Sequence, residues 1–600
     1  MTESIKNSAI ARMIKNIVER DKGVFGLCFL YTIFATGIPF FAVLLPKFLI
    51  EKLIVPNPKV AGVLTIVIIF FVVGAIIYFL KTFIGEIADP RITVLRIDYV
   101  RDLGVKLLKM DFKYTEDSSF SDKYERAFNS ISTNNNGIEG IYHKLFEVPA
   151  SLVIVLILSI FVAIKSPWII LAILVNIAAT TLVAIKVQKI NYSYKEKLSK
   201  HKRRVGYYSD TTQDFAYGKD VRIYDLKDRI IDNFNFEIKG YLDVFKLIKN
   251  KEYYLSFITL LTLLISDGVT YGMLIYLAVQ GMSIADFSMY LVATARLSLE
   301  LNTLSGYVTF ILEEYMYVKD FYMFMDKDFG EKGGEAPAVP KGETLEIEFK
   351  DISFKYPNTD KNVYTNFSLK IPKGQKLALV GINGAGKTTL VKLLTGLYKV
   401  DSGEIIINGI NVNDYKKSEL FSMFSVVFQD VNILAYTIAE NIAGASKDID
   451  YEKVDKVLKK VGLYEKVQSL PKGTENLMLK VIEEDGAIFS GGESQKLSIA
   501  RALYKGGNMV IMDEPTSALD ALAEAEIYSE FNDLTEGKTS IYISHRLAST
   551  KFCDVIALID GDGLREYGTH EELMEKGGVY YDMFMTQGKY YRESQEECSA

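Results

Sequence analysis

A glycine-rich segment in the second half of the chain has the residue types and the spacing of a phosphate-binding loop. An apolar run at 376–380 precedes it, and a helical pattern at 390–394 follows it. Glycines let backbone N–H groups close around a phosphate, while a lysine and a threonine suit phosphate oxygens and Mg²⁺. The segment therefore predicts a site for a nucleoside triphosphate with Mg²⁺. It fits the pattern G-x-x-x-x-G-K-[ST] with Gly381, Ile382, Asn383, Gly384, Ala385, Gly386, Lys387, Thr388 and Thr389.

Two carboxylates close a short apolar run further along the chain. The run at 509–512 has the composition of a buried parallel strand, and Asp513 and Glu514 follow it directly. Asp513 is placed to hold Mg²⁺, and Glu514 is placed to polarise a water molecule for attack on the γ-phosphate. Acids at the end of a buried strand are costly unless a metal or a basic group compensates, so a role as mere strand caps is disfavoured.

A third motif narrows the chemistry. Ser490-Gly491-Gly492-Glu493, followed by a helical pattern at 497–503, resembles the signature motif of ABC ATPases. The resemblance implies ATP as the nucleotide, and it assigns catalysis to a Q-loop glutamine that also reaches Mg²⁺ and to a switch histidine, together with Glu514. It further implies an aromatic residue stacked on adenine and a D-loop. In this chain these positions are Gln429, His545, Tyr356, and Ser517 with Asp520.

The same resemblance implies that one chain is not sufficient. In this family two ATP-binding domains sandwich two ATP molecules head to tail, and each signature faces the phosphate loop of the other domain. Ser490 and the glycine N–H groups after it begin a helix, which suits contact with the partner's γ-phosphate. None of the motifs is degenerate, so a homodimer is favoured and a heterodimer stays open. Glu493 replaces the usual glutamine, and we expect it to point toward ribose hydroxyls.

The composition places the first half of the chain in a lipid bilayer. The 600 residues are 49% hydrophobic with a mean hydropathy of +0.13, and long uncharged runs occur only in this half. A helix needs about 20 apolar residues to cross the bilayer core. A net charge of −6 gives no reason to expect nucleic acid as a partner. Six spans are predicted, at about 24–46, 60–80, 148–164, 166–186, 253–279 and 286–312.

Lysine and arginine residues set the orientation of these spans. They are frequent in the segments after the second and the fourth span and rare in the opposite loops. By the positive-inside rule, both termini and the ATP-binding domain lie in the cytoplasm, which predicts a multi-pass protein of the plasma or inner membrane. Within the two basic segments, 112–120 and 209–217 resemble by position the coupling helices of the family.

These patterns divide the chain into successive parts. Apolar residues at helical spacing predict an amphipathic elbow helix on the inner membrane face at 1–22, and a Gly/Pro-punctuated linker is expected at 327–342. The fold class is therefore a multidomain membrane protein. An all-α six-helix transmembrane domain at 23–326, with cytoplasmic helical extensions, is followed by an α/β phosphate-loop ABC domain at 343–590 and a tail at 591–600.

Six spans before one such domain resemble the exporter-type half-transporters of the ABC family. The resemblance implies ATP-driven export by alternating access, with the cargo open between peptide, lipid and drug-like molecules. An importer on the same architecture and a membrane sensor that uses ATP without transport are the alternatives. Asp267, Arg296 and Glu300 are charges that lipid does not tolerate within the last two spans. They form either a structural ion pair or part of a cavity that contacts the cargo.

Overall fold

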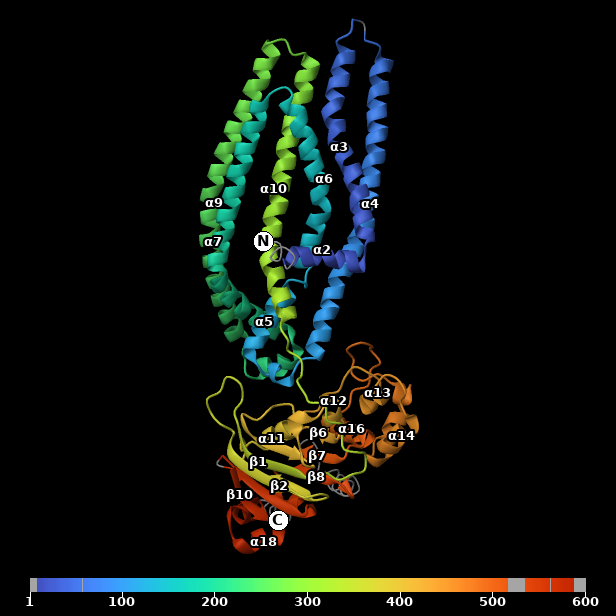
Figure 1. Ribbon diagram of the computed structural model, residues 1–600, viewed down its shortest axis with the longest axis vertical. Coiled ribbons are helices and arrows are strands. Elements are labelled where there is room, and N and C mark those ends of the chain that lie inside the picture. Colours follow the sequence, from blue (N-terminus) through green and yellow to red (C-terminus); the bar gives the residue numbers. More distant parts are fainter. Residues whose placement is uncertain (1–7, 57, 516–534, 562, 588–600) are drawn as a thin grey trace. The chain divides into compact units, whose positions relative to one another are not determined.

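The chain folds as two compact units, neither of which is continuous in sequence. The computed structural model describes residues 8–56, 58–515, 535–561 and 563–587 (Figure 1). The helical unit comprises Met1–Leu108 and Ser121–Asp328, and the sheet unit comprises Lys109–Phe120 and Phe329–Ala600. The short segment Lys109–Phe120 therefore belongs to the sheet unit, although the residues on both sides of it in the sequence belong to the helical unit.

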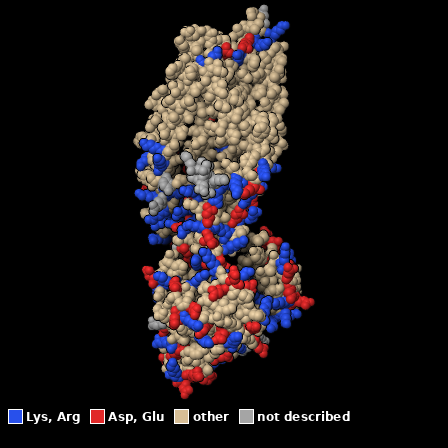
Figure 2. All heavy atoms as spheres, in the orientation of Figure 1, with Lys and Arg blue, Asp and Glu red and all other residues tan. Residues whose placement is uncertain are grey.

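Long helices make up the helical unit. Figure 2 shows that charged side chains gather toward the ends of this unit and leave a largely uncharged surface between them. The apolar stretches of the helices form this uncharged surface. Several of the helices continue past it as segments with charged side chains. In chain order the helices are α2 (Ala9–Arg20), α3 (Gly23–Leu53), α4 (Val60–Leu108), α5 (Ser118–Asn129), α6 (Gly137–Ala163), α7 (Pro167–Gln213), α8 (Gly218–Ile223), α9 (Lys227–Val279) and α10 (Ile284–Asp326).

Within the described residues, five stretches are long and apolar enough to cross a membrane. They are Gly23–Leu53, Val60–Leu108, Gly137–Ala163, Pro167–Lys195 and Lys227–Val279. The sixth expected span, 286–312, lies in α10, which is a continuous helix of 43 residues but is not among these five. Side chains of α10 nevertheless share a core with α3 and α6, because Ala293 and Leu297 pack with Val43 and Leu158.

An amphipathic helix precedes the first long helix, as its apolar spacing predicts. In α2, Met13 and Ile17 are buried, whereas Ile14 and Val18 are each 41% exposed. Arg12 forms an ion pair of 2.7 Å with Asp326 at the end of α10. Arg20, the last residue of the helix, pairs with Asp98 at 3.2 Å and with Asp102, so a buried face and ion pairs near both ends fasten the helix to the unit. The rest of the expected segment, 1–7, lies outside the described residues.

The charges of the last two helices are partly paired. Arg296 and Glu300, one turn apart on α10, form an ion pair of 3.1 Å, and their side chains are 33% and 11% exposed. The Nε atom of Arg296 is buried without a hydrogen-bond partner among the described residues. Asp267, on α9, is half-buried and takes no part in this pair. The geometry thus provides the ion pair that the spacing of four residues allows.

The sheet unit contains a four-stranded and a six-stranded sheet. The strands of the six-stranded sheet run parallel except for β10, and the fully buried β7 and β8 have the continuous apolar composition of a core parallel sheet. The smaller sheet has the order β2 (Tyr364–Ile371), β1 (Ile347–Phe354), β4 (Ser402–Ile407), β5 (Ile410–Asn411). The larger has the order β10 (Gly563–Gly568), β9 (Val555–Asp560), β3 (Lys376–Val380), β8 (Thr539–Ile543), β7 (Met509–Asp513), β6 (Phe424–Val427).

Helices cover the larger sheet and carry the loops at its carboxyl edge. Three parallel strands, β3, β7 and β8, end next to the phosphate loop, the acidic pair and the switch histidine, so the topology brings these segments to one edge. The helices are α11 (Lys387–Leu394), α12 (Lys417–Ser422), α13 (Ile438–Ala443), α14 (Tyr451–Lys460), α15 (Tyr464–Gln468), α16 (Gly491–Lys505), α18 (His570–Lys576) and a helical stretch at 579–587.

The segment Lys109–Phe120 is bonded to the rest of the sheet unit. The N–H group of Asp111 donates to the carbonyl of Phe329 at 2.8 Å. The carboxylate of Glu116 accepts hydrogen bonds from Lys392 of α11 at 2.7 Å and from Tyr398 at 2.5 Å. Burial alone would raise the pKa of Glu116, but these two donors outweigh it and lower the pKa. The segment is thus attached to the helix that begins with the lysine of the phosphate loop.

The ion pair in α10 can be tested by charge reversal. Arg296→Glu alone would place two acids one turn apart, and we expect it to lower the free energy of unfolding by about 2–3 kcal/mol, below the range for a fully buried pair. The double variant with Glu300→Arg should recover most of this loss. Thermal unfolding in lipid nanodiscs measures both. A double variant no more stable than the single one would show that the pair does not stabilise the helix.

Candidate functional site

The phosphate loop connects the end of β3 to the start of α11. Gly384 and Gly386 have φ angles of 82° and 97°, which residues with a Cβ rarely adopt. A Cβ on Gly381 would lie 2.1 Å from the backbone oxygen of Ile559, so this position also requires glycine. The loop leads onto the N-terminus of α11, whose first N–H groups have no partner within the helix and suit an anion.

Lys387 is buried against this loop. The residue is 5% exposed, and its Nζ atom donates to the carbonyl oxygens of Gly381 at 2.9 Å and Ile382 at 3.2 Å. Burial lowers the pKa of Lys387, and the nearby carboxylates of Glu514 and Asp513 oppose this effect. A buried ammonium group held by carbonyl oxygens can exchange them for the stronger acceptors of a phosphate.

Asp513 ends β7 and is fully buried. Neither oxygen of its carboxylate has a hydrogen-bond partner among the described residues. Burial raises the pKa of this carboxyl group, while the neighbouring Thr388 hydroxyl and Lys387 ammonium act in the opposite direction. An orphaned carboxylate beside a hydroxyl is a set of hard oxygen donors of the kind that Mg²⁺ prefers. The residues at this position therefore fit the ion.

Glu514 lies between side chains from two other loops at the same edge of the sheet. Gln429, which follows β6, donates from Nε2 to the Glu514 Oε2 atom at 2.9 Å. The Nε2 atom of His545, which follows β8, lies 2.5 Å from the Oε1 atom. Glu514 has a φ of 51°, a strained conformation that costs about 1–3 kcal/mol and is typical of functional sites. The structure thus brings together the three residues that the sequence assigns to catalysis, and such a carboxylate can accept a proton from water.

The signature residues begin α16 and satisfy one another. The Oγ atom of Ser490 accepts the N–H of Glu493 at 3.3 Å, and the Glu493 carboxylate accepts the N–H of Ser490 at 2.8 Å. Glu493 also forms an ion pair of 2.6 Å with Lys466. Burial would raise the pKa of Glu493, but the Lys466 ammonium and the Ser490 backbone outweigh it and lower the pKa.

The Glu493 carboxylate folds back onto its own helix start, because a serine and a glutamate three residues apart form a capping box. Its expected contact with ribose hydroxyls stays a prediction. Gly491 and Gly492, the first two residues of α16, follow the serine cap and keep the helix start free of side chains.

Of the remaining predicted residues, the structure describes Tyr356 but not the two D-loop residues. The hydroxyl of Tyr356 lies 2.8 Å from the Oγ1 atom of Thr389, so this ring stands beside the phosphate loop. It contacts Phe354 edge to face, with ring centroids 5.2 Å apart. Ser517 and Asp520 lie outside the described residues.

Sequence reasoning missed two polar residues that hold the site in place. Gln495 is buried and donates from Nε2 to the carbonyl of Glu514 at 3.1 Å. Gln495 lies two residues after Glu493 on the helix that the signature begins. A glutamine on the buried face of this helix was therefore the signal in the sequence that could have identified it. Lys466, the partner of Glu493, lies 27 residues upstream and no motif indicates it.

Comparisons with known proteins agree with this arrangement. The ABC transporter family model matches residues 364–517. The subtilin transport ATP-binding protein SpaT of Bacillus subtilis is 26% identical over 597 residues, which cover 98% of this chain and 95% of SpaT. An ATP-dependent lipid A-core flippase of Haemophilus influenzae is 39% identical over 242 residues, and the match spans only 40% of each protein. A solved bacterial Atm1-family ABC exporter with ATP bound has a TM-score of 0.75 at 20% identity, covering 96% of this chain and 99% of that chain.

Fold, site and relatives together define an ABC transporter, with a helical membrane domain fused to one ATP-binding domain. Within that class the chain has the exporter fold and is homologous to ABC exporters, and it is a multi-pass membrane protein. It accordingly binds nucleotide and couples ATP hydrolysis to transport.

Glu514→Gln separates hydrolysis from binding. The amide is nearly isosteric but cannot accept a proton, and loss of a general base typically costs about 10²–10⁴-fold in rate. We expect ATPase turnover to fall by this factor while ATP affinity stays near that of the wild type, whereas Lys387→Ala should weaken ATP binding itself. Turnover and fluorescent-nucleotide binding on the full chain in nanodiscs measure both. Near-normal turnover of Glu514→Gln would move the base to another residue, with His545 the next candidate.

Proposed function

We propose that this chain is one half of a dimeric exporter in the plasma or inner membrane, with both termini and the sheet unit in the cytoplasm. The observation that carries the proposal is the complete catalytic set at one sheet edge: Lys387, Asp513, Glu514 and His545 in a single chain. The basic segments beside the helices support the orientation. An importer is not favoured, because the homologues are exporters.

In the proposed reaction, Lys387 and the loop N–H groups hold the β- and γ-phosphates, with Tyr356 beside the adenine. Glu514 accepts a proton from the attacking water molecule. The water oxygen then forms a bond to the γ-phosphorus, and the bond between the γ-phosphorus and the ADP oxygen breaks. Gln429 and His545 orient the carboxylate. When bound, Mg²⁺ would supply positive charge at the phosphate oxygens. The residues that would hold the ion are Thr388, Gln429 and Asp513.

Two chains are needed for each reaction in this proposal. The capped helix start of the signature, Ser490 to Glu493, offers a hydroxyl and N–H groups that suit a γ-phosphate, which the family resemblance assigns to the partner's site. The signature of each chain therefore completes the site of the other, as a D-loop with Ser517 and Asp520 would. ATP binding closes the pair and turns the membrane cavity outward, and hydrolysis reopens it.

Dimerisation of the chain with itself is testable. Since every motif is intact, we expect the purified chain alone to hydrolyse ATP in nanodiscs that contain two copies and to be inactive in nanodiscs that contain one. Mass photometry gives the copy number, and turnover is measured on each fraction. An inactive fraction with two copies would point to a heterodimer with a second half-transporter.

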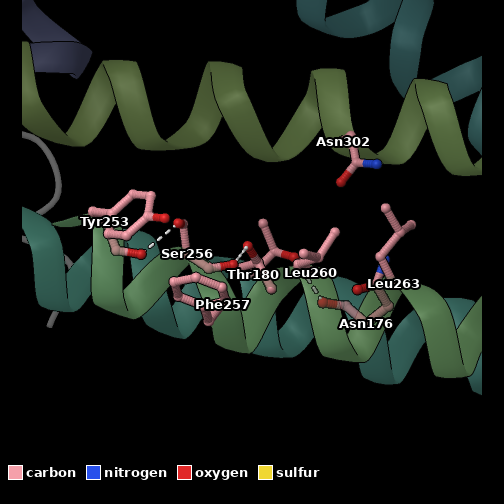
Figure 3. A pocket seen from close by; sticks show the side chains of 9 residues that line it. Asn176, Thr180, Tyr253, Ser256, Phe257, Leu260, Leu263 and Asn302 are labelled. Atoms are coloured by element: carbon pink, nitrogen blue, oxygen red, sulfur yellow. Dashed lines mark hydrogen bonds between the residues drawn. The ribbon is translucent and has the colours of Figure 1, made fainter.

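A cavity in the helical unit is a candidate for the cargo site. It has a volume of about 530 Å³ and lies between α7, α9 and α10, and Figure 3 shows Asn302 reaching from one helix toward side chains of the other two. No charged residue lines it, so Asp267, Arg296 and Glu300 are not part of this cavity. Its lining residues are Asn176, Thr180, Tyr253, Ser256, Phe257, Thr259, Leu260, Leu263 and Asn302.

We infer that the cargo is peptide-like. The amides of Asn176 and Asn302 match the donors and acceptors of a peptide main chain, and the rings of Tyr253 and Phe257 offer contact for apolar side chains. Of the two relatives compared above, only SpaT, which is named for subtilin transport, aligns over nearly the whole chain and therefore through the helical unit. The flippase match covers 40% of the chain and carries less weight for the cargo.

The cavity makes a prediction about stimulation of the ATPase. A short peptide with blocked ends, no charge and two aromatic residues should stimulate turnover in nanodiscs, whereas lipid A should not. Asn302→Leu removes a hydrogen-bonding side chain and should raise the half-stimulating peptide concentration about tenfold, equivalent to one such bond. Gln280→Leu, at the exposed end of α9 outside the cavity, is the matched control. Stimulation by lipid A alone would contradict the peptide assignment, and hydrolysis with no flux of either probe would favour a sensor.

A further inference from the structure

Gln587 spans the backbone of the loop that carries the switch histidine. Its Nε2 atom donates to the carbonyl of His545 at 2.6 Å, and its Oε1 atom accepts the N–H of Leu547 at 2.9 Å. The two bonds thus hold the backbone group before Arg546 and the backbone group after it. One side chain that donates and accepts at once fixes both the position and the direction of this backbone.

The neighbouring backbone groups of the loop are satisfied locally. The N–H of Arg546 donates to the Ser544 hydroxyl at 2.9 Å, and the carbonyl of Arg546 accepts from the Ser549 hydroxyl at 2.6 Å. These bonds close the turn on itself. The bonds from Gln587 are different in kind, because they tie the turn to a residue 40 or more positions away in sequence.

The helical stretch that carries Gln587 is itself anchored. The Glu566 carboxylate accepts the N–H groups of Val579 at 2.9 Å and Tyr580 at 3.0 Å, at the start of the stretch. The Tyr580 hydroxyl lies 2.9 Å from the Thr550 hydroxyl and 2.8 Å from the Nδ1 atom of His570. Gln587 therefore reaches the loop from a fixed base.

We propose that Gln587 is a positioning residue for ATP hydrolysis, which acts through His545. By holding the main chain on both sides of Arg546, directly after the histidine, it keeps the imidazole Nε2 atom at 2.5 Å from the carboxylate of Glu514. The proposal rests on the role in hydrolysis proposed above for Glu514 and His545. It adds one side chain to the residues that support hydrolysis, that of Gln587 at the end of the helix at 579–587.

Substitution of Gln587 in the full chain tests this. Gln587→Ala loses both bonds, and displacement of a catalytic group by about 1 Å can cost up to about 10²-fold, so we expect kcat to fall about tenfold or more while KM for ATP changes less than about twofold. Gln587→Asn, one methylene shorter, cannot reach both partners and should behave alike. Thr586→Ala is the control, because among the described residues that hydroxyl donates to the Asp582 carbonyl of its own helix and not to the histidine loop.

A double variant separates positioning from general stability. If Gln587 acts through His545, then Gln587→Ala should lower the residual turnover of His545→Ala by less than about twofold, because residues that act as a unit are not additive. A full additional loss in that background, a rise in KM that matches the loss of kcat, or normal kcat in Gln587→Ala would each overturn the proposal. Normal turnover of His545→Ala would instead overturn the role of the histidine in the proposed function, so the two failures are distinguishable.

Discussion

Lys387 and Asp513 place opposite charges inside the sheet unit, and much of the surrounding structure serves to keep them there. They are 5% and 0% exposed, yet the ammonium bonds to loop carbonyls, and the carboxylate has no hydrogen-bond partner among the described residues. Burying an ionised group without compensation costs several kcal/mol. A polyphosphate with a divalent cation offers an anion to one group and a cation to the other. The protein interior is thus organised around a ligand of this charge pattern.

The fold could be predicted from the sequence wherever one local property decides it. Apolar runs, four of them uncharged and the one in α9 interrupted by Asp267, identified the five strongly apolar helices, and short apolar runs identified the strands β3, β7 and β8. The lengths of α4, α7 and α9 could not be predicted in the same way, because their charged ends have the periodicity of any solvated helix. Hydropathy also says little about α10, whose charges Arg296 and Glu300 compensate each other in space.

The site shows the same division between local and distant information. The phosphate loop, the acidic pair and the signature are contiguous motifs, so residue types at fixed spacing were sufficient to find them. Lys466 and Gln587 act on Glu493 and on the backbone at His545 from 27 and 42 positions away, and a lysine or a glutamine at such a distance has no distinguishing pattern. Only the packing of α15 and of the helix at 579–587 reveals these contacts.

The chain passes between the two units at three places: after Leu108, after Phe120 and after Asp328. In the sheet unit, the segment after Leu108 and the segment after Asp328 are hydrogen-bonded to each other. Met110 and Gly330 pair as a β-bridge, and the Asp111 N–H donates to the Phe329 carbonyl. A single covalent connection between two units permits rotation about it, whereas several connections at different positions restrict rotation about any one of them. A rotation of the sheet unit would therefore pull on α4, α5 and α10 at the same time, through the covalent chain alone.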